Sequence, residues 1–197
     1  MKVLFLDIDG VVNCSKTMQR HRGVIGIDPY MALLVDRIVQ ATGCEVVLSS
    51  TWRLWPETRE EVKRQVCQFI DTTPQLLRSM SNGGFINGED YDGKGGYQSA
   101  SRGYEIQDWL DRHPEVTQYA ILDDDSDMLA QQKPNFFKTT WDDGLNEEIA
   151  NRVIAHLNDE RQLQESPLYQ MDTEGRIKMV CPDCQKEHHS KDLAKTA

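Results

Sequence analysis

Short apolar segments in this chain each end in a cluster of carboxylates or hydroxyls. They alternate with segments that have the 3.6-residue apolar periodicity of amphipathic helices, so the chain repeats a strand–helix pattern. That pattern is typical of a central parallel sheet covered by helices. The carboxyl ends of such strands share one edge, where open α/β sheets bind ligands. The segments and the polar residues that follow are Val3–Leu6 with Asp7 and Asp9, Glu45–Leu48 with Ser49, Ser50 and Thr51, and Tyr119–Leu122 with Asp123, Asp124 and Asp127.

The segments between the strands predict where the helices begin and end. Asp28 before Pro29 has the residue types of an N-cap and a first helical position, and Gly43 is a typical stop. The stretch from Thr72 to Ser101 is rich in glycine and too long for a connector, so we expect a functional or mobile loop. The other expected elements are helices from Pro56 to about Ile70, from Arg102 to before His113, through Met128 and Leu129, and after the N-cap Asn146, a strand from Asn135 to Thr140, and a hairpin from Leu168 to Val180.

Length and composition predict one domain with a small appendage. A chain of 197 residues suits a single core, and the sequence becomes polar beyond about Asn158. We therefore expect a main domain over residues 1–160 and a C-terminal extension over residues 161–197. The predicted fold class is α/β, with a central parallel sheet.

Charge and hydropathy exclude several classes of protein. The formal net charge of −10 argues against a broad basic surface for duplex nucleic acid. No apolar run reaches the roughly 18 residues that a membrane span needs. The segment Met1–Leu6 is too short for a signal peptide, so we expect a cytoplasmic protein without membrane association. Five irregularly spaced cysteines do not suggest a disulfide framework.

Asp7 and Asp9 stand one residue apart where the first apolar segment ends. Two carboxylates this close repel each other unless a cation lies between them or one is protonated. The options are a divalent metal site, a nucleophile with an acid/base partner, or both. An Asp-Gly turn with incidental charge is the simpler alternative, because Asp and Gly are ordinary turn residues.

The acids and hydroxyls at the three strand ends suit phosphoryl transfer. Mg²⁺ prefers oxygen ligands, which Asp7, Asp123 and a backbone carbonyl near Asp9 would supply. A carboxylate nucleophile would form an aspartyl-phosphate, and Asp9 would protonate the leaving alcohol and then activate water. Ser49 or Ser50 would hold phosphate oxygens. Arg102 would balance charge in the transition state.

Asp7-Ile8-Asp9-Gly10, a hydroxyl after the second strand, a basic residue before the last motif and Asp123-Asp124 occur in this order. They resemble the four motifs of haloacid-dehalogenase (HAD) superfamily phosphatases. Over roughly residues 1–158 the chain is similar to the small HAD domains associated with RNA repair, and to the phosphatase half of polynucleotide kinase-phosphatases. The segments that carry this narrower resemblance are Val47–Arg53, Arg102–Leu110 and Ile121–Asp125.

The resemblance implies a fold and catalytic roles. The fold would be a HAD-like Rossmannoid three-layer sandwich with a minimal cap and a small C-terminal extension. Asp7 would be the nucleophile and first metal ligand, and Asp9 the general acid/base beside the same metal. Arg102 would take the usual place of a lysine or arginine, with Lys94 as a weaker rival.

The resemblance also implies the groups that bind metal and phosphate. Asp123 would bind Mg²⁺, and Asp124 would be a direct ligand or lie one shell further out. Asp127 fits a variant of the same motif in which the acids are spaced further apart, so the choice between Asp124 and Asp127 as a metal ligand stays open. Ser49 would bind phosphate, although the doubled serine leaves Ser50 as a candidate.

An open site in this superfamily implies a large substrate. The predicted function is a phosphomonoesterase acting on a nucleotide or a nucleic acid 3′-phosphate end. The alternatives are a mononucleotide or other small phosphoester, a phosphoprotein, or a HAD-fold binding module without activity. Arg53 would bind substrate beside Trp52. A base could stack on an aromatic ring there, but we favour the alternative that Trp52 and Trp55 pack inward. Further basic residues lie in the first loop at Arg20, His21 and Arg22.

The C-terminal extension carries residue types that bind zinc. They are Cys181, Cys184, His188 and His189. Their close spacing is unlike that of a zinc finger, so a hairpin end with reduced thiols is the alternative. The sequence leaves the oligomeric state open.

Overall fold

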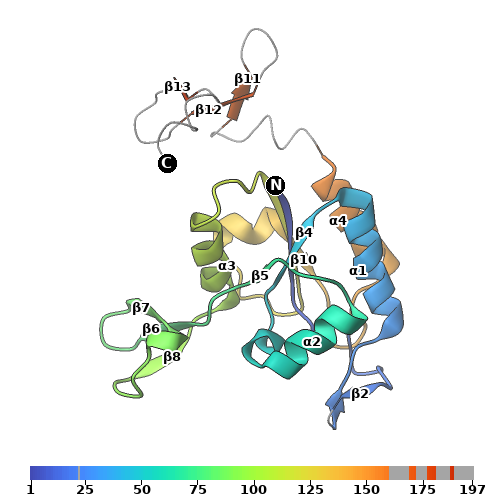
Figure 1. Cartoon of the computed structure of the whole chain (residues 1–197), viewed down its shortest axis with the longest axis horizontal. Helices are drawn as coiled ribbons and strands as arrows, with labels where there is room; N and C mark the ends of the chain where they lie inside the picture. Colours follow the sequence, from blue (N-terminus) through green and yellow to red (C-terminus); the bar gives the residue numbers. More distant parts are fainter. Residues whose placement is uncertain (22, 160–168, 172–176, 181–186, 189–197) are drawn as a thin grey trace. The chain divides into compact units, whose positions relative to one another are not determined.

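The computed structural model describes most of the chain, and the chain divides into two compact units, Met1–Leu157 and Asn158–Ala197. A parallel sheet with helices on both faces forms the first unit (Figure 1). The described residues are 1–21, 23–159, 169–171, 177–180 and 187–188.

The central sheet has five strands in the order β10-β9-β1-β4-β5, and each neighbouring pair is parallel. Its middle strands are apolar and buried on both faces, as expected for a parallel sheet that helices cover. This confirms the predicted α/β class. The strands are β1 (Lys2–Leu6), β4 (Glu45–Leu48), β5 (Asp71–Thr72), β9 (Gln118–Asp123) and β10 (Phe136–Lys138).

Alternating side chains of β1 separate the core into two layers. Leu4 and Leu6 pack into one cluster, which includes residues of α1, α2 and α4. Val3 and Phe5 pack into the other, with Ile106 of α3. The result is a three-layer sandwich. The helices are α1 (Pro29–Thr42), α2 (Pro56–Gln65), α3 (Arg102–Asp111) and α4 (Glu147–Leu157).

The ends of α1 and the start of α4 confirm the predicted caps. The Asp28 carboxylate accepts a hydrogen bond of 2.9 Å from the backbone N–H of Tyr30. Gly43 ends the helix with φ at 63°, a conformation that glycine adopts without strain. The Asn146 side chain accepts a hydrogen bond of 3.0 Å from the N–H of Ile149.

Two predicted helices differ from the structure. The second ends at Gln65 rather than near Ile70, because the Ile70 N–H donates to Val46 and leads the chain into β5. Ile70 lies beyond the end of this helix and is 52% exposed. The expected helix through Leu129 is replaced by the 3₁₀ turn η3 (Ala130–Asn135), whose Gln132 side chain accepts from the Leu129 N–H.

Two insertions flank the carboxyl edge of the sheet. The hairpin of β2 (Arg20–His21) and β3 (Val24–Ile25) lies between β1 and α1. The stretch expected to be irregular forms a three-stranded antiparallel sheet instead. Neither insertion amounts to a cap domain. The strands of that sheet are β6 (Leu76–Ser79), β7 (Phe85–Asn87), which leads into the 3₁₀ turn η2 (Gly88–Asp90), and β8 (Tyr97–Ser99).

The second unit contains a small antiparallel sheet. Strand β11 (Tyr169–Met171) pairs with β12 (Ile177–Val180), as the predicted hairpin requires, and β12 pairs with β13 (Glu187–His188). The zinc prediction falls on Cys181, Cys184 and His189, which lie outside the described residues, and no finding supports it. None of the described helices has the length and apolar character to cross a membrane.

Candidate active site

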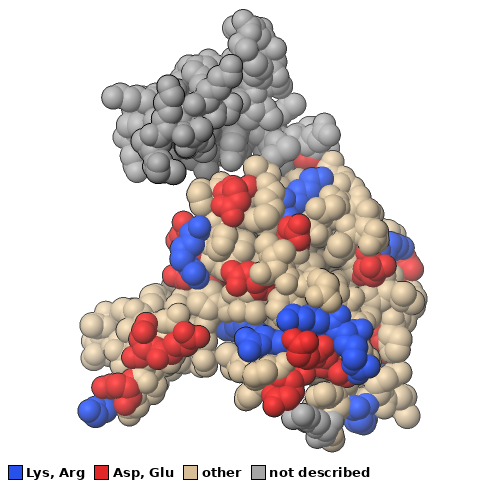
Figure 2. All heavy atoms as spheres, in the orientation of Figure 1, with Lys and Arg blue, Asp and Glu red and all other residues tan. Residues whose placement is uncertain are grey.

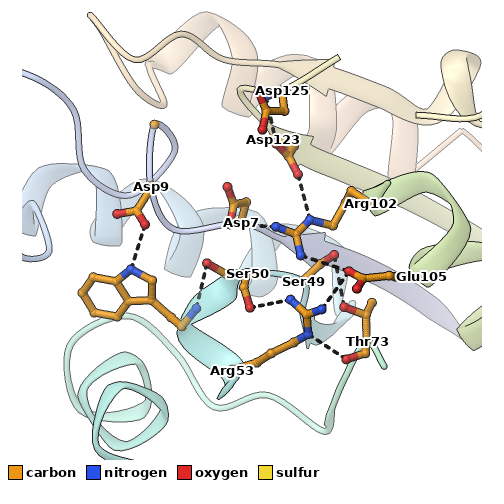
Figure 3. Close-up of polar contacts among 12 residues, drawn as sticks. Asp7, Asp9, Ser49, Ser50, Arg53, Thr73, Arg102, Glu105, Asp123 and Asp125 are labelled. Carbon is orange, nitrogen blue, oxygen red and sulfur yellow. Dashed lines mark hydrogen bonds and ion pairs between the residues drawn. The ribbon is translucent and has the colours of Figure 1, made fainter. Parts of the chain in front are cut away.

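Strand register brings the three predicted motifs to one level of the sheet. Leu6 pairs with Leu48 on one side and with Leu122 on the other. The residues that follow these three positions, Asp7, Ser49 and Asp123, therefore lie at one level of the sheet, with Asp7 between the other two. Backbone hydrogen bonds continue this alignment, since the Asp7 N–H donates to Leu122 at 3.0 Å. Figure 3 shows the side chains converging at this edge.

Asp7, Asp123 and Asp124 form a carboxylate cluster. One oxygen of each lies within 4.8 Å of the others. Burial, opposed by Arg102, raises the pKa of Asp7 to about 6. Burial and then the neighbouring Asp7 raise the pKa of Asp123 to about 8. Raised pKa values in buried carboxyls indicate that the protein alone does not supply enough positive charge nearby for all of them to ionise. A bound cation would supply that charge, and carboxylate oxygens are ligands that Mg²⁺ prefers.

Gly10 makes the close approach to Asp124 possible. Its φ is +73°, in the left-handed region, and a Cβ built there would lie 2.3 Å from the Asp124 carboxyl carbon. Only a residue without a side chain fits this position. The Asp-Gly pair of the first motif is therefore needed for packing against the last motif, beyond its role in a turn.

Arg102 faces the cluster from the first turn of α3. Its Nε lies 3.5 Å from Asp123 and its Nη2 lies 4.0 Å from Asp7 (Figure 3). The Asp127 carboxylate accepts a 2.7 Å hydrogen bond from the Arg102 N–H, so it holds the helix start rather than joining the carboxylate cluster. Lys94, the predicted rival, is exposed on the segment that joins η2 to β8.

Arg53 is buried, which argues against its predicted direct contact with substrate. Its guanidinium donates to the carbonyl oxygens of Ser50, Thr73 and Pro74. It also donates to the Glu105 carboxylate at 2.7 Å. Because its donors are bonded to the protein itself, the Arg53 side chain stabilises the conformation of the loop after β4.

Glu105 is a site residue that the sequence interpretation missed. Its carboxylate accepts from Arg53 and, at 3.3 Å, from Arg102, and it also accepts from the N–H of Leu76. Burial raises the pKa of Glu105, and the two arginines oppose that shift. The i,i+3 spacing from Arg102 on one helix was the available signal.

The structure separates the two serines that the sequence left open. The Ser50 hydroxyl hydrogen-bonds to Asp7 and lowers the pKa of that carboxyl, in opposition to burial. The Ser49 hydroxyl accepts from Thr73 at 3.5 Å, on the side away from Asp7 (Figure 3). The hydroxyl nearer the cluster is therefore that of Ser50.

Asp9 points away from the carboxylate cluster. It accepts hydrogen bonds of 3.0 Å from Trp52 Nε1 and of 2.9 Å from Asn13 Nδ2. Its carboxylate is not a member of the cluster, and the metal contact predicted at this position is through a backbone carbonyl rather than through the side chain. Trp52 packs in the core as expected, but Trp55, which the same interpretation places inside, is 56% exposed.

The sheet order and the acidic residues at the carboxyl ends of β1 and β9 are typical of a HAD-type domain. The family described as the HAD domain in Swiss Army Knife RNA repair proteins matches residues 3–150, and the chain belongs to this family. The comparisons with curated proteins and with solved structures find no match.

Proposed function

We propose that this protein is a Mg²⁺-dependent phosphomonoesterase acting on nucleotide or nucleic acid ends, with the 3′-phosphate end as its first candidate substrate. One observation carries the proposal. The Asp7 carboxylate belongs to the carboxylate cluster and lies 4.0 Å from the Arg102 guanidinium. Asp9, two residues further along the chain, is held by a hydrogen bond from Trp52. A nucleophile, an acid/base and charge-balancing groups therefore surround a single point.

Asp7, Asp123 and Asp124 would hold the Mg²⁺ ion. The fit is argued from their clustered oxygens and from the raised pKa values of the two buried carboxyls, both of which a cation would offset. When bound, the ion would reduce repulsion between an anionic nucleophile and an anionic phosphate.

The chain's own groups would carry the covalent steps. A carboxylate oxygen of Asp7 attacks phosphorus, the bond from phosphorus to the ester oxygen breaks, and Asp9 gives that oxygen a proton. Asp9 then takes a proton from water, whose oxygen attacks the aspartyl-phosphate and releases inorganic phosphate. Arg102 and Ser50 would hold the non-bridging oxygens as charge shifts onto them.

Two features support a nucleic acid end as substrate. The family is described by its place in RNA repair proteins. The flanking insertions are a two-stranded hairpin and a three-stranded sheet, which leave room for a chain that continues beyond its terminal phosphate. Figure 2 shows basic side chains over α2 mixed with acidic ones, an arrangement suited to a local contact rather than a long track.

The test is phosphate release from a panel of phosphoesters with Mg²⁺ or with EDTA. The panel contains 3′- and 5′-phosphorylated oligonucleotides, mononucleotides and a phosphoserine peptide. We expect the highest kcat/KM on the 3′-phosphorylated oligonucleotide. Asp7→Asn abolishes turnover, whereas Asp36→Asn, an exposed change on α1, does not. Activity that survives Asp7→Asn overturns the mechanism, and a preference for mononucleotides or peptide overturns the substrate.

Asp9→Asn tests the acid/base role separately. General acid catalysis contributes roughly 10²–10⁴-fold, and it matters most for poor leaving groups. The variant should therefore lose more activity on an alkyl phosphate than on p-nitrophenyl phosphate, and it should accumulate phosphoenzyme. Equal losses on the two esters with no accumulation contradict the role.

A further inference from the structure

A cavity of about 660 Å³ opens beside Asp9. Its volume falls in the range of roughly 300–1,000 Å³ that small-molecule sites occupy. One wall comes from the β2–β3 hairpin and another from the 3₁₀ turn η1 (Thr51–Leu54) with the residues after it. The residues that matter for its chemistry are Asp9, Arg20, His21, Trp52, Trp55 and Trp141.

The aromatic lining of this cavity is partly open to solvent. Trp55 is 56% exposed and Trp141 is 43% exposed, whereas Trp52 is buried and hydrogen-bonded to Asp9. Exposed tryptophan rings offer large flat apolar surfaces, and beside a polar catalytic group they are typical of a binding site rather than of a solvated face.

Cationic and hydrogen-bonding groups adjoin these rings. Arg20 donates through Nη1 to the carbonyl oxygens of Thr17 and Gln19, which fixes its guanidinium at the rim. His21 lies 6.0 Å from the Trp52 ring, centroid to centroid. Its Nε2 is buried and has no hydrogen-bond partner among the described residues, so an occupant or a water that moves in would satisfy it.

The position of Asp9 determines which part of a substrate reaches the cavity. Asp9 lines the cavity, and in the proposed reaction it protonates the ester oxygen. The phosphorus lies next to Asp7, so the group attached to the ester oxygen extends past Asp9. That group is the alcohol part of the substrate, which leaves the site after the first step.

We propose that this cavity binds the terminal nucleoside of an unpaired nucleic acid end, with its base stacked on Trp55 or Trp141. The proposal rests on the proposed phosphatase function and specifies its substrate. Aromatic rings beside an arginine are the groups on which single-stranded bases stack. A paired terminal base is already stacked in its duplex, so the cavity selects single-stranded or frayed ends.

The three-stranded insertion, which lies on the other side of α2 from the β2–β3 hairpin in Figure 1, is a poor surface for a strand that continues beyond its end. Exposed acids stand on the segment around η2, at Glu89, Asp90 and Asp92, and Figure 2 shows acidic side chains gathered over that part of the chain. A long backbone track would meet repulsion there. The stacked nucleoside and its phosphate therefore supply most of the affinity.

The first test compares two 3′-phosphorylated single strands, one with a terminal base and one that is abasic at the terminal nucleotide. Stacking of one base contributes about 1–3 kcal/mol, so wild-type kcat/KM should be roughly 5- to 150-fold higher with the base. Trp55→Ala or Trp141→Ala should bring this ratio close to 1. Trp55→Phe, which keeps a ring, should retain most of it.

The control is Tyr30→Ala, which removes an aromatic ring of 53% exposure from α1, outside the cavity. It should leave the ratio unchanged. A wild-type ratio near 1, or a ratio that neither tryptophan variant lowers, overturns the proposal.

A binding measurement separates this proposal from the catalytic one. In an Asp7→Asn background, fluorescence anisotropy with a labelled 3′-phosphorylated single strand should show weaker binding after Trp55→Ala or Trp141→Ala. A blunt-ended hairpin should bind more weakly than the single strand. If no phosphoester is hydrolysed but these differences persist, the phosphatase function fails and the cavity assignment stands. If Asp7-dependent hydrolysis is found but the terminal base has no effect, the cavity assignment alone fails.

Discussion

The guanidinium of Arg53 donates to the Glu105 carboxylate at 2.7 Å, and the two side chains are only 4% and 6% exposed. Glu105 also accepts a hydrogen bond from Arg102, which faces the carboxylate cluster. A buried acid therefore links an arginine that shapes the loop after β4 to an arginine that faces Asp7.

Glu105→Gln should lower the free energy of unfolding by about 3–5 kcal/mol, because it leaves the buried Arg53 charge without its carboxylate partner. Urea denaturation followed by circular dichroism measures the change. Glu60→Gln is the matched control, since it removes only an exposed pair with Lys63, which contributes less than about 1 kcal/mol. A Glu105→Gln variant as stable as Glu60→Gln contradicts the role of the pair.

Ser50→Ala should reduce kcat/KM by up to about 100-fold, because it removes a donor close to Asp7 and to the transferred phosphate. Ser49→Ala removes a hydroxyl that contacts Thr73 instead, and it should cost about 1 kcal/mol of stability. Steady-state kinetics and thermal denaturation of both variants provide the comparison. A larger kinetic loss for Ser49→Ala would reverse the assignment.

Gly10→Ala should weaken the carboxylate cluster as well as the fold. A new Cβ would meet Asp124 at 2.3 Å, and the positive φ adds strain of about 1–3 kcal/mol. Gly43→Ala has a positive φ too but meets nothing within 4 Å, so it isolates the strain. We expect Gly10→Ala, but not Gly43→Ala, to need a higher Mg²⁺ concentration than wild type for half-maximal activity. Equal Mg²⁺ requirements in both variants would show that Asp124 is not displaced.

The stability of the protein in EDTA should fall as pH rises through the range in which Asp7 and Asp123 ionise. The pKa of Asp7 is raised to about 6 and that of Asp123 to about 8, above the roughly 3.9 of an unfolded aspartate. The folded state then holds protons that the unfolded state releases, so this stabilisation is complete below about pH 4 and is lost as pH rises through those values.

Thermal denaturation between pH 5 and pH 8.5 measures this dependence. In EDTA, Asp123→Asn should have a higher Tm than wild type at pH 8, with a smaller difference at pH 5. Mg²⁺ should raise the wild-type Tm more at pH 8, because it binds ionised carboxylates. Parallel pH profiles for wild type and Asp123→Asn would contradict the raised pKa values, and Asp36→Asn serves as the control for removing an acid elsewhere.

Local patterns in the sequence were sufficient to predict the sheet and most of its helices. Apolar runs define β1, β4 and the core of β9, and the Asp28 and Gly43 caps bound α1 to within a residue. Convergence of Asp7 and Asp123 follows from the parallel order of their strands, because carboxyl ends share an edge.

Other features depend on tertiary contacts that a linear pattern does not contain. The end of α2 is determined by pairing of β5 with β4, and the choice between Ser49 and Ser50 by how the chain turns after Leu48. Arg53 had the residue type of a substrate ligand, but its burial against Glu105 is visible only in the folded chain.

Asp9 is clamped between donors from Trp52 and Asn13, and Asn13 in turn accepts from the N–H of Gly10. The Asp9 side chain is therefore already oriented before substrate binds, and no closing movement is needed to position it. We expect turnover to depend on chemistry and on departure of the dephosphorylated strand, rather than on the opening and shutting of a lid.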